Sequence, residues 1–425
     1  MGRRILFVSE AVSIAHVARP TVLADAFADS DDEIHFASSG AYDFCHAGRP
    51  WQVHRLQSVP AADFLRRLAS PWPLYSESEL ERYLAADRAL IESVQPDVVV
   101  HDFRLTMPIA GRLAGVPVLS LCNAHWSPFA PHPPRHSPDS PALRFFGAAM
   151  VDPVFRAIWP SIDRVHRRAT NRLRRRHGQP AVASLASYYC DGDVVLYADV
   201  PELVPLHGAP PSHVYLGPVV WSPALPKPPW WQEAVSEPAP KAYVTLGSTG
   251  RTDLLPLIVN ACRAQGIATL VATAGRQDFD DRTAAVHAEF RSDLHHRRLR
   301  PRDAGLGHFA ADFLPGSEAA AVADFVICNG GSATAHQALA QGRPVLGICS
   351  NLDQVLTMET IAAAGAGLMI RASEVTATRL DALLARMRGD PALAEGARRI
   401  GTAFAARNAG TACRAAIDAL LPVRR

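Results

Sequence analysis

Short apolar runs recur along the chain, separated by stretches with helical spacing. They occupy 5–8, 34–37, 98–101 and 116–121 in the first half, and 242–246, 268–273, 322–328 and 345–348 in the second. An unbroken apolar run is typical of a parallel strand that helices cover on both faces. Helical spacing at 20–27, 78–94 and 107–114 fills the intervals. The alternation predicts an α/β fold built on parallel sheets.

A proline-rich stretch divides the chain into two halves of similar size. The 425 residues suggest two or three domains, at roughly 150 residues per domain. Prolines gather between 221 and 240, as in a semi-rigid linker, and the alternation then restarts. We therefore predict a Rossmann-like domain over 1–221, a linker over 222–240, a second domain over 241–400 and a final helix within 401–425. Ligands are expected in a cleft beyond the carboxyl ends of the strands.

Charge and hydropathy exclude several classes of protein. The formal net charge of +2 is too balanced for nucleic-acid binding, and the basic run 164–177 is interpreted as a solvated helix face. No stretch reaches 18 apolar residues, so no transmembrane segment is predicted. The seven cysteines are scattered without a C-x-x-C motif, which is typical of a reducing compartment. Because the run 5–8 is too short for a signal peptide, a cytoplasmic protein is expected.

Two glycine-rich turns follow apolar runs in the second half. One contains Gly247, Ser248 and Thr249, and the other spans 329–334. Glycines let backbone N–H groups approach an anion, and the following helix N-terminus and hydroxyl groups favour negative charge. Each turn alone could simply need positive φ angles, but two turns on adjacent strand ends predict a diphosphate site. Neither matches the P-loop or the G-x-G-x-x-G motif.

The segment around the second turn resembles the donor-binding signature of family 1 glycosyltransferases. The resemblance is carried by 313–316 (FLPG), 329–334 (NGGSAT), 341–345 (QGRPV), 351–354 (NLDQ) and 364–367 (AGAG). More weakly, 14–20 (IAHVARP) is similar to the family's first loop, and 96–102 (PDVVVHD) to its strand that ends in aspartate. The family includes bacterial natural-product and macrolide enzymes. It implies the GT-B fold, in which two Rossmann-like, doubly wound domains face a central cleft.

The resemblance implies a donor-binding domain over 241–400, an acceptor-binding domain over 1–221 and a final helix that packs back on the latter. Phosphates would contact the two turns, Phe313 and Leu314 would flank the nucleobase, and Gln337 would approach the ribose. Asp353 and Gln354 would bind the transferred sugar. The implied donor residues are Gly247, Ser248, Thr249, Phe313, Leu314, Asn329, Gly330, Gly331, Ser332, Ala333, Thr334, Gln337, Asp353 and Gln354. The donor would be a UDP- or dTDP-sugar, with no metal and no other cofactor.

The same resemblance makes His16 the general base and Asp102 its partner. A hydroxyl is a weak nucleophile near neutral pH, and a histidine in reach can take its proton while a carboxylate stabilises the imidazolium. We place His16 in the loop after the first strand and Asp102 at the end of a later strand, which puts both at one sheet edge. The chain departs from the family at Asn329, where histidine is usual, at Gln337, where glutamate is common, and at Phe313, where tryptophan is preferred.

The acceptor is the least defined ligand. Aromatic residues of the first half could line an apolar pocket or simply pack in the core: Trp72, Tyr75, Trp126, Phe129, Phe145 and Phe146. An inverting transfer to an apolar small molecule or lipid alcohol is predicted, with peripheral membrane contact only for a lipid. The alternatives are a nucleotide-sugar epimerase of the same fold and a nucleotide-sugar-binding protein without turnover. The protein is expected to be a monomer or homodimer.

Overall fold

The computed structural model describes residues 2–68, 70, 72–131, 134–247, 249–273 and 307–421. The chain divides into two compact units. Unit 1 comprises Met1–Pro133, Phe155–Trp221 and Ala406–Arg425, and unit 2 comprises Pro134–Val154 and Ser222–Ala405.

In the described part of unit 1 the strands form one parallel seven-stranded sheet, in the order β3-β2-β1-β4-β5-β6-β7. Its chain order reverses between β1 and β4, the position where ligands bind in open α/β sheets. Ser9, the last residue of β1, pairs with Asp102, the last residue of β4. The strands are β1 (Arg4–Ser9), β2 (Glu33–Ser38), β3 (Gln52–Arg55), β4 (Val98–Asp102), β5 (Val118–Cys122), β6 (Val194–Tyr197) and β7 (His213–Tyr215).

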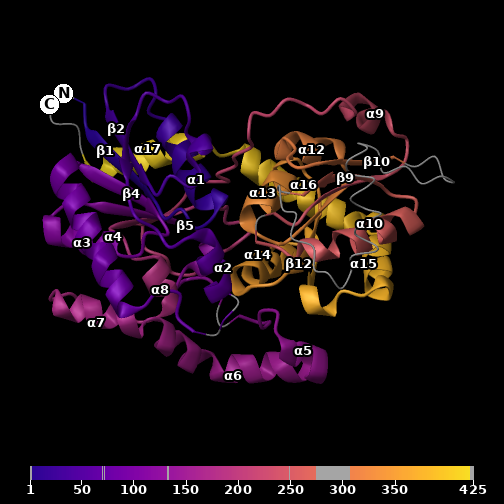
Figure 1. The fold of residues 1–425 in the computed structure, drawn as a ribbon, viewed down its shortest axis with the longest axis horizontal. Helices are drawn as coiled ribbons and strands as arrows, with labels where there is room; N and C mark the ends of the chain where they lie inside the picture. The colour runs from indigo at the N-terminus through magenta and orange to yellow at the C-terminus, as the bar shows by residue number, and fades with distance from the viewer. Residues whose placement is uncertain are drawn as a thin grey trace. The chain divides into compact units, whose positions relative to one another are not determined.

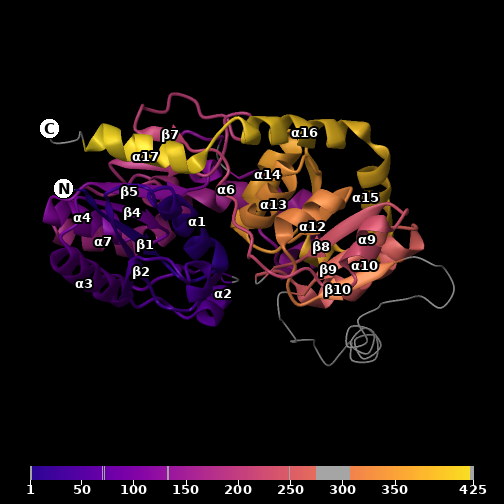
Figure 2. The ribbon, with the colours of Figure 1, turned by 90° about the horizontal axis from the view of Figure 1, so that it is seen from above.

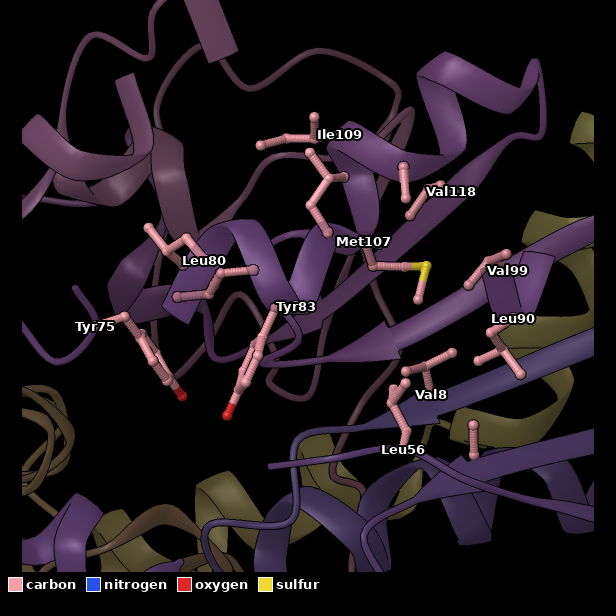
Figure 3. Close-up of a cluster of buried hydrophobic side chains, with 14 of the residues drawn as sticks. Val8, Leu56, Tyr75, Leu80, Tyr83, Leu90, Val99, Met107, Ile109 and Val118 are labelled. Carbon is pink, nitrogen blue, oxygen red and sulfur yellow. The ribbon is translucent and has the colours of Figure 1, made fainter. Parts of the chain in front are cut away.

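Helices cover both faces of this sheet because alternate side chains of β1 point to opposite sides. Leu6 and Val8 pack in one buried cluster, part of which Figure 3 shows, whereas Ile5 and Phe7 pack in another. The second cluster includes Ile417 of α17, which lies against α1 (Figures 1 and 2). The helices are α1 (Ile14–Asp25), α2 (Ala61–Leu68), α3 (Glu77–Val94), α4 (Met107–Ala114), α7 (Arg168–Arg176), α8 (Leu185–Tyr189) and α17 (Ala409–Leu420), with η1 (Asp43–Cys45) and η2 (Ala124–Trp126).

Unit 2 repeats the topology with a parallel six-stranded sheet in its described residues, in the order β10-β9-β8-β11-β12-β13. Here the order reverses between β8 and β11. The strands are β8 (Lys241–Thr245), β9 (Ala268–Ala272), β10 (His308–Ala311), β11 (Phe325–Cys328), β12 (Val345–Cys349) and β13 (Gly367–Arg371). Around them lie α5 (Pro141–Phe146), α9 (Trp231–Ser236), α10 (Leu255–Ala264), α12 (Gly316–Val322), α13 (Ser332–Ala340), α14 (Leu352–Ala363), α15 (Ala377–Gly389), α16 (Pro391–Ala405), η3 (Thr252–Leu254) and η5 (Ala372–Glu374).

The structure differs from the predicted boundaries in two segments. The stretch 222–240, expected as a linker, contains α9, whose Trp231 is buried. The segment Pro134–Val154, expected in the first half, belongs to unit 2. There Asp152 accepts a hydrogen bond of 2.6 Å from Arg371, and the His136 ring lies 2.8 Å from Glu359. Helix α6 (Ala148–His166) continues from this segment into unit 1.

The first helix begins earlier than the sequence indicated. We expected it to start at Pro20, with His16 in the preceding loop, but α1 begins at Ile14 and contains Pro20. Proline in a helix interior removes the hydrogen bond to the carbonyl four residues earlier and its ring crowds that carbonyl, but here tertiary packing keeps the helix intact. The correction matters because His16 and Arg19, three residues apart on a helix, lie on the same face.

Candidate active site

In unit 1, His16 and Asp102 form the hydrogen-bonded pair that the sequence suggested. The Nδ1 of His16 on α1 lies 2.7 Å from Oδ1 of Asp102 at the end of β4. A carboxylate can only accept, so Nδ1 carries the proton and the Nε2 of a neutral ring has a free lone pair. Asp102 is buried, whereas the His16 side chain is partly exposed, so solvent or a ligand can reach the imidazole.

Arg19 is a third member of this group, which we did not predict. Its Nε and Nη2 each donate to one oxygen of Asp102 at 2.8 Å, and its Nη1 donates to Oδ1 of Asn123 at 2.7 Å. Asn123 in turn donates to Asp199 at 3.1 Å. Such forked bonds between arginine and a carboxylate are strong and geometrically restrictive. Arg19 therefore holds both oxygens of the carboxylate that orients His16.

This arrangement determines the charge of Asp102. Burial by itself raises the pKa of the Asp102 carboxyl, but the Arg19 guanidinium and His16 outweigh burial and leave the pKa below its usual value. Asp102 is thus ionised at neutral pH, and its charge is balanced by Arg19. With a neutral imidazole the group of three carries no net charge, and it becomes a cation when His16 takes up a proton.

Phe103, directly after Asp102, fixes the plane of the His16 ring. The two rings stack with centroids 4.8 Å apart at 19°. Phe103 has a φ of 59°, in the left-handed region that a residue with a β-carbon adopts at a cost of about 1–3 kcal/mol. At this turn the chain changes direction. Asp102, before Phe103, contacts His16, whereas Arg104, after it, belongs to a buried ion network.

That ion network supports the base of the site. The fully buried Arg104 donates to Glu10 at 2.7 Å and to Asp87 at 2.8 Å, and the Tyr83 hydroxyl donates to Glu10 at 2.9 Å. Burial raises the pKa of both carboxyl groups even though Arg104 lowers it. The backbone N–H of Glu10 also donates to the carbonyl of Asp102 at 3.0 Å. The network therefore joins the ends of β1 and β4 directly beside His16.

An aromatic cavity lies close to the His16 ring in unit 1. Tyr189 stacks on Phe103 with centroids 5.5 Å apart, and Trp126 packs against Tyr189 at 4.6 Å. Tyr75, predicted to contact the acceptor, lines the cavity and lies beside Tyr83 (Figure 3). The cavity is small, about 10 Å³, which is room for about one water molecule. Its lining residues are Leu74, Tyr75, Leu80, Leu105, His166, Thr170, Leu185, Tyr188 and Tyr189.

Two of the other aromatic residues that we predicted at the acceptor lie elsewhere in unit 1. Trp72 is exposed and lines a different hollow with Asp63, whereas the Phe129 ring packs 5.0 Å from His213. Phe145 and Phe146 are exposed on α5, which belongs to unit 2. Within unit 1 the structure thus brings Tyr75 and Trp126 near His16 and does not group Trp72 and Phe129 with them.

In unit 2, the turn after β11 leads into the N-terminus of α13. Gly331 is the N-cap of this helix and brings no capping side chain of its own. Gly330 has a φ of 78°, and a β-carbon there would lie 2.7 Å from Cys349 Sγ, so the tight turn requires glycine. A β-carbon at Gly331 would lie 3.3 Å from Asn329 Oδ1, which is a close contact. Ser332, Ala333 and Thr334 form the first turn of α13, and none of the three is buried.

The two glycine-rich turns of unit 2 are joined by one hydroxyl group. Thr249 Oγ1 accepts hydrogen bonds from Asn329 Nδ2 at 2.8 Å and from Gln354 Nε2 at 3.2 Å. Asn329 Oδ1 accepts from the N–H of Gly331 at 3.1 Å. Asn329, which stands where the family usually has histidine, therefore links the turn after β8 to the turn after β11. Gly247 has a φ of 58° beside this link, whereas Ser248 lies outside the described residues.

The residues predicted for the nucleobase and ribose lie close together. Phe313 is half exposed and Leu314 is buried, both just before α12. A β-carbon on Gly316, at the start of α12, would come within 2.5 Å of Gln337 Oε1, so Gln337 of α13 lies directly over this turn. The spacing of the sequence motifs thus corresponds to neighbouring positions at the carboxyl edge of the sheet.

The two residues predicted to bind the sugar lie at the start of α14. Gln354 Oε1 accepts from the N–H groups of Ser350 at 2.8 Å and Asn351 at 3.3 Å, and Asn351 Oδ1 accepts from the N–H of Gln354 at 3.1 Å. This capping box and the bond to Thr249 engage the amide of the buried Gln354. Asp353 is partly exposed in the same turn. Among the described residues, no group of three or more His, Cys, Asp or Glu could hold a metal ion.

Comparison with known proteins assigns the chain to a family. Residues 304–420 match the EryCIII-like family, which is the C-terminal domain of erythromycin biosynthesis protein CIII-like proteins. The chain is 39% identical over 404 residues to the PGL/p-HBAD biosynthesis glycosyltransferase of Mycobacterium tuberculosis, covering 95% of this chain and 89% of that relative. It is 37% identical to the PGL/p-HBAD biosynthesis rhamnosyltransferase of Mycobacterium bovis, covering 95% and 84%. The chain is a family 1 glycosyltransferase.

The GT-B fold is confirmed by similarity to a solved structure. Spinosyn rhamnosyltransferase SpnG, complexed with thymidine diphosphate, matches with a TM-score of 0.63 at 17% identity, covering 97% of this chain and 99% of that chain. This glycosyltransferase therefore has the two parallel-sheet domains that the strand–helix alternation predicted. The site residues that sequence analysis missed are Arg19 and Phe103. Arg19 stands three residues after His16, so its spacing was a usable signal, whereas no sequence pattern indicates the positive φ of Phe103.

Proposed function

We propose that this glycosyltransferase transfers the sugar of a UDP- or dTDP-sugar to a hydroxyl of an apolar small molecule or lipid. The transfer inverts the anomeric carbon and needs no metal. The observation that carries the proposal is the 2.7 Å contact between His16 and Asp102, which leaves Nε2 of His16 as a proton acceptor. An acceptor hydroxyl within hydrogen-bond reach of Nε2 can lose its proton as its oxygen attacks the anomeric carbon. The imidazolium that forms is then stabilised by Asp102.

The leaving group is the nucleoside diphosphate, which gains negative charge as its bond to the sugar breaks. The N-terminus of α13 supports a role in stabilising that charge, because the backbone N–H groups of a first helical turn and the helix dipole favour anions. Gly331 allows a phosphate to approach the backbone, and the Thr249 hydroxyl lies at the same edge. Attack on the face opposite the leaving group inverts the anomeric carbon. These interactions need no metal ion.

The donor and acceptor classes rest on chemistry and on the relatives. SpnG has been solved in complex with thymidine diphosphate, which favours dTDP as the carrier here. The side chains around the small cavity of unit 1 are mostly leucines and tyrosines, which favours an apolar acceptor on this side of His16. His166, Thr170 and the tyrosine hydroxyls are the polar groups there. The acceptor contacts proposed for Tyr75 and Trp126 follow from their positions at or beside this cavity.

Incubating the protein with UDP- and dTDP-sugars and a panel of apolar alcohols tests the proposal. The expected product is a glycoside whose anomeric configuration, read by NMR coupling constants, is opposite to that of the donor. EDTA is expected to leave the rate unchanged. A changed donor without a glycoside would instead indicate an epimerase, and a thermal shift without any product would indicate binding alone. Activity that EDTA abolishes and Mg²⁺ restores would overturn the metal-independent mechanism.

A further inference from the structure

Helices α5 and α6 expose a row of large apolar side chains. These side chains, which we call the α6 apolar face, are between 42% and 80% exposed: Phe145, Phe146, Met150, Val154, Ile158 and Val165. Met150, Val154 and Ile158 follow one another at intervals of four, which places them on one side of the helix. Isolated exposed apolar residues are ordinary on a protein surface, but a continuous row of six within 21 residues marks an interaction site.

The opposite side of α6 already provides the packing that holds the helix. Asp152 and Phe155 are buried, and the Phe155 ring packs against Trp159 at 5.7 Å. Asp163 accepts hydrogen bonds from the N–H of Leu185 and from Arg167. Helix α6 therefore has two apolar sides, of which only one contacts the rest of the protein. The exposed side is not needed to bury the helix.

The charge around the α6 apolar face is strongly positive. Residues 141–176 contain nine arginines and two aspartates. Both aspartates are paired, Asp152 with Arg371 and Asp163 with Arg167. Arg144 and Arg164 are exposed next to Phe145 and Val165, and neither has an ion-pair partner within the ranges that the structure describes. Arg156 is also exposed, but it lies on the other side of α6, about 200° around the helix from Val154. Apolar side chains with arginines beside them and no unpaired carboxylate complement an anionic surface.

We propose that the α6 apolar face docks on the surface of a bilayer that contains anionic lipids. The apolar side chains enter the boundary between headgroups and acyl chains, and the arginines contact lipid phosphates. A second copy of the chain fits less well, because pairing this face with itself would bring arginines of like charge together. None of the described helices is long and apolar enough to span a bilayer, so the contact would be interfacial. The docking does not depend on the proposed sugar transfer.

Co-sedimentation of the full chain with phospholipid vesicles tests the docking. We expect the protein to bind vesicles of phosphatidylcholine with phosphatidylglycerol, and to bind phosphatidylcholine alone much more weakly. The variant Met150→Ser/Val154→Ser/Ile158→Ser should lower the partition coefficient about tenfold or more, because it removes the apolar contacts. Arg144→Gln/Arg164→Gln should lower it about fivefold for each arginine removed. Leu113→Ser, which alters an exposed leucine on α4, is the matched control and should not change binding.

Two further measurements make the outcome decisive. Circular dichroism should show the same helix content in every variant, because the substituted side chains are exposed. Transfer to a water-soluble acceptor should be unchanged in the serine variant, so that a failure of the proposed function and a failure of docking are separate results. Wild-type protein that ignores anionic vesicles would overturn the inference. So would equal binding by the serine variant, or a wild-type dimer that the serine variant dissociates.

Discussion

The substitution Arg19→Lys tests how the His16–Asp102 pair is held. Arg19 donates two hydrogen bonds of 2.8 Å to Asp102 and one of 2.7 Å to Asn123. Lysine keeps the charge but lacks the planar fork, so it can replace one of these bonds and not all three. A hydrogen bond to a charged group contributes about 1.5–3 kcal/mol, and the retained charge offsets part of the loss. We expect the free energy of unfolding to fall by about 2–4 kcal/mol.

The same substitution should also lower turnover. If Asp102 is no longer held by Arg19 at both oxygens, the His16 imidazole can shift. A misplacement of a catalytic group by about 1 Å can cost about a hundredfold in rate. We therefore expect kcat to fall by about tenfold to a hundredfold. The KM for the donor should stay constant, because the proposed donor residues all lie in unit 2. Steady-state kinetics and urea denaturation of the same preparation measure both effects.

Arg371→Lys is the matched control for this experiment. Arg371 also donates to two carboxylates, Asp152 at 2.6 Å and Glu374 at 2.7 Å, but it belongs to unit 2 and does not touch the His16–Asp102 pair. It should lose stability to a similar degree while kcat of the folded protein stays within about threefold, since the catalytic geometry is untouched. Equal losses of kcat in both variants, or full kcat in Arg19→Lys despite lost stability, would refute a positioning role for Arg19.

Other substitutions follow from the same structure. His16→Ala should lower kcat by about a hundredfold or more, the scale of general-base loss, with donor affinity unchanged by calorimetry; near-normal turnover would remove His16 from the mechanism. Gly331→Val should abolish nucleotide binding with little change in melting temperature, whereas Gly330→Ala should destabilise the fold because of its φ of 78° and the clash with Cys349. Burial alone raises the pKa of Glu79, but Arg67 and Ser76 lower it to about 2 from the usual 4.5. Its ionised form therefore stabilises the fold above pH 4.5, and that contribution is lost as the pH falls to about 2. The stability difference between wild type and Glu79→Gln should shrink over this interval, and a constant difference would contradict the assignment.

The pairing of His16 with Asp102 could be predicted because it depends on topology. Residues that follow parallel strands meet at one edge of the sheet, and β1 and β4 are neighbours with Ser9 opposite Asp102. The same reasoning brought the two glycine-rich turns together, since β8 and β11 are paired. In both units these residues lie where the strand order reverses. An inference of this kind requires only the order of the elements and their polarity.

Contacts between distant segments could not be predicted in this way. Asp152 and Arg371 are 219 residues apart, and neither stands in a motif that indicates an ion pair. Their contact attaches the segment Pro134–Val154 to unit 2, although its position in the sequence suggested the first half. The predicted start of the first helix at Pro20 was wrong for a similar reason. In α1, packing of the helix outweighs the missing hydrogen bond at Pro20.

Asn329 shows why residue type alone does not determine a role. Histidine is usual at this position in the family, and an amide lacks the charge with which a protonated histidine would bind a phosphate. In the structure its two amide atoms are engaged with Thr249 and with the N–H of Gly331. Asn329 therefore shapes the turn, and the N-terminus of α13 is the element suited to an anion. An amide can hold both contacts because it donates and accepts at once. A protonated histidine, with two donors and no acceptor, could still donate to Thr249 but could not accept the Gly331 N–H, so charge at this position would be gained at the expense of the hydrogen bond within the turn.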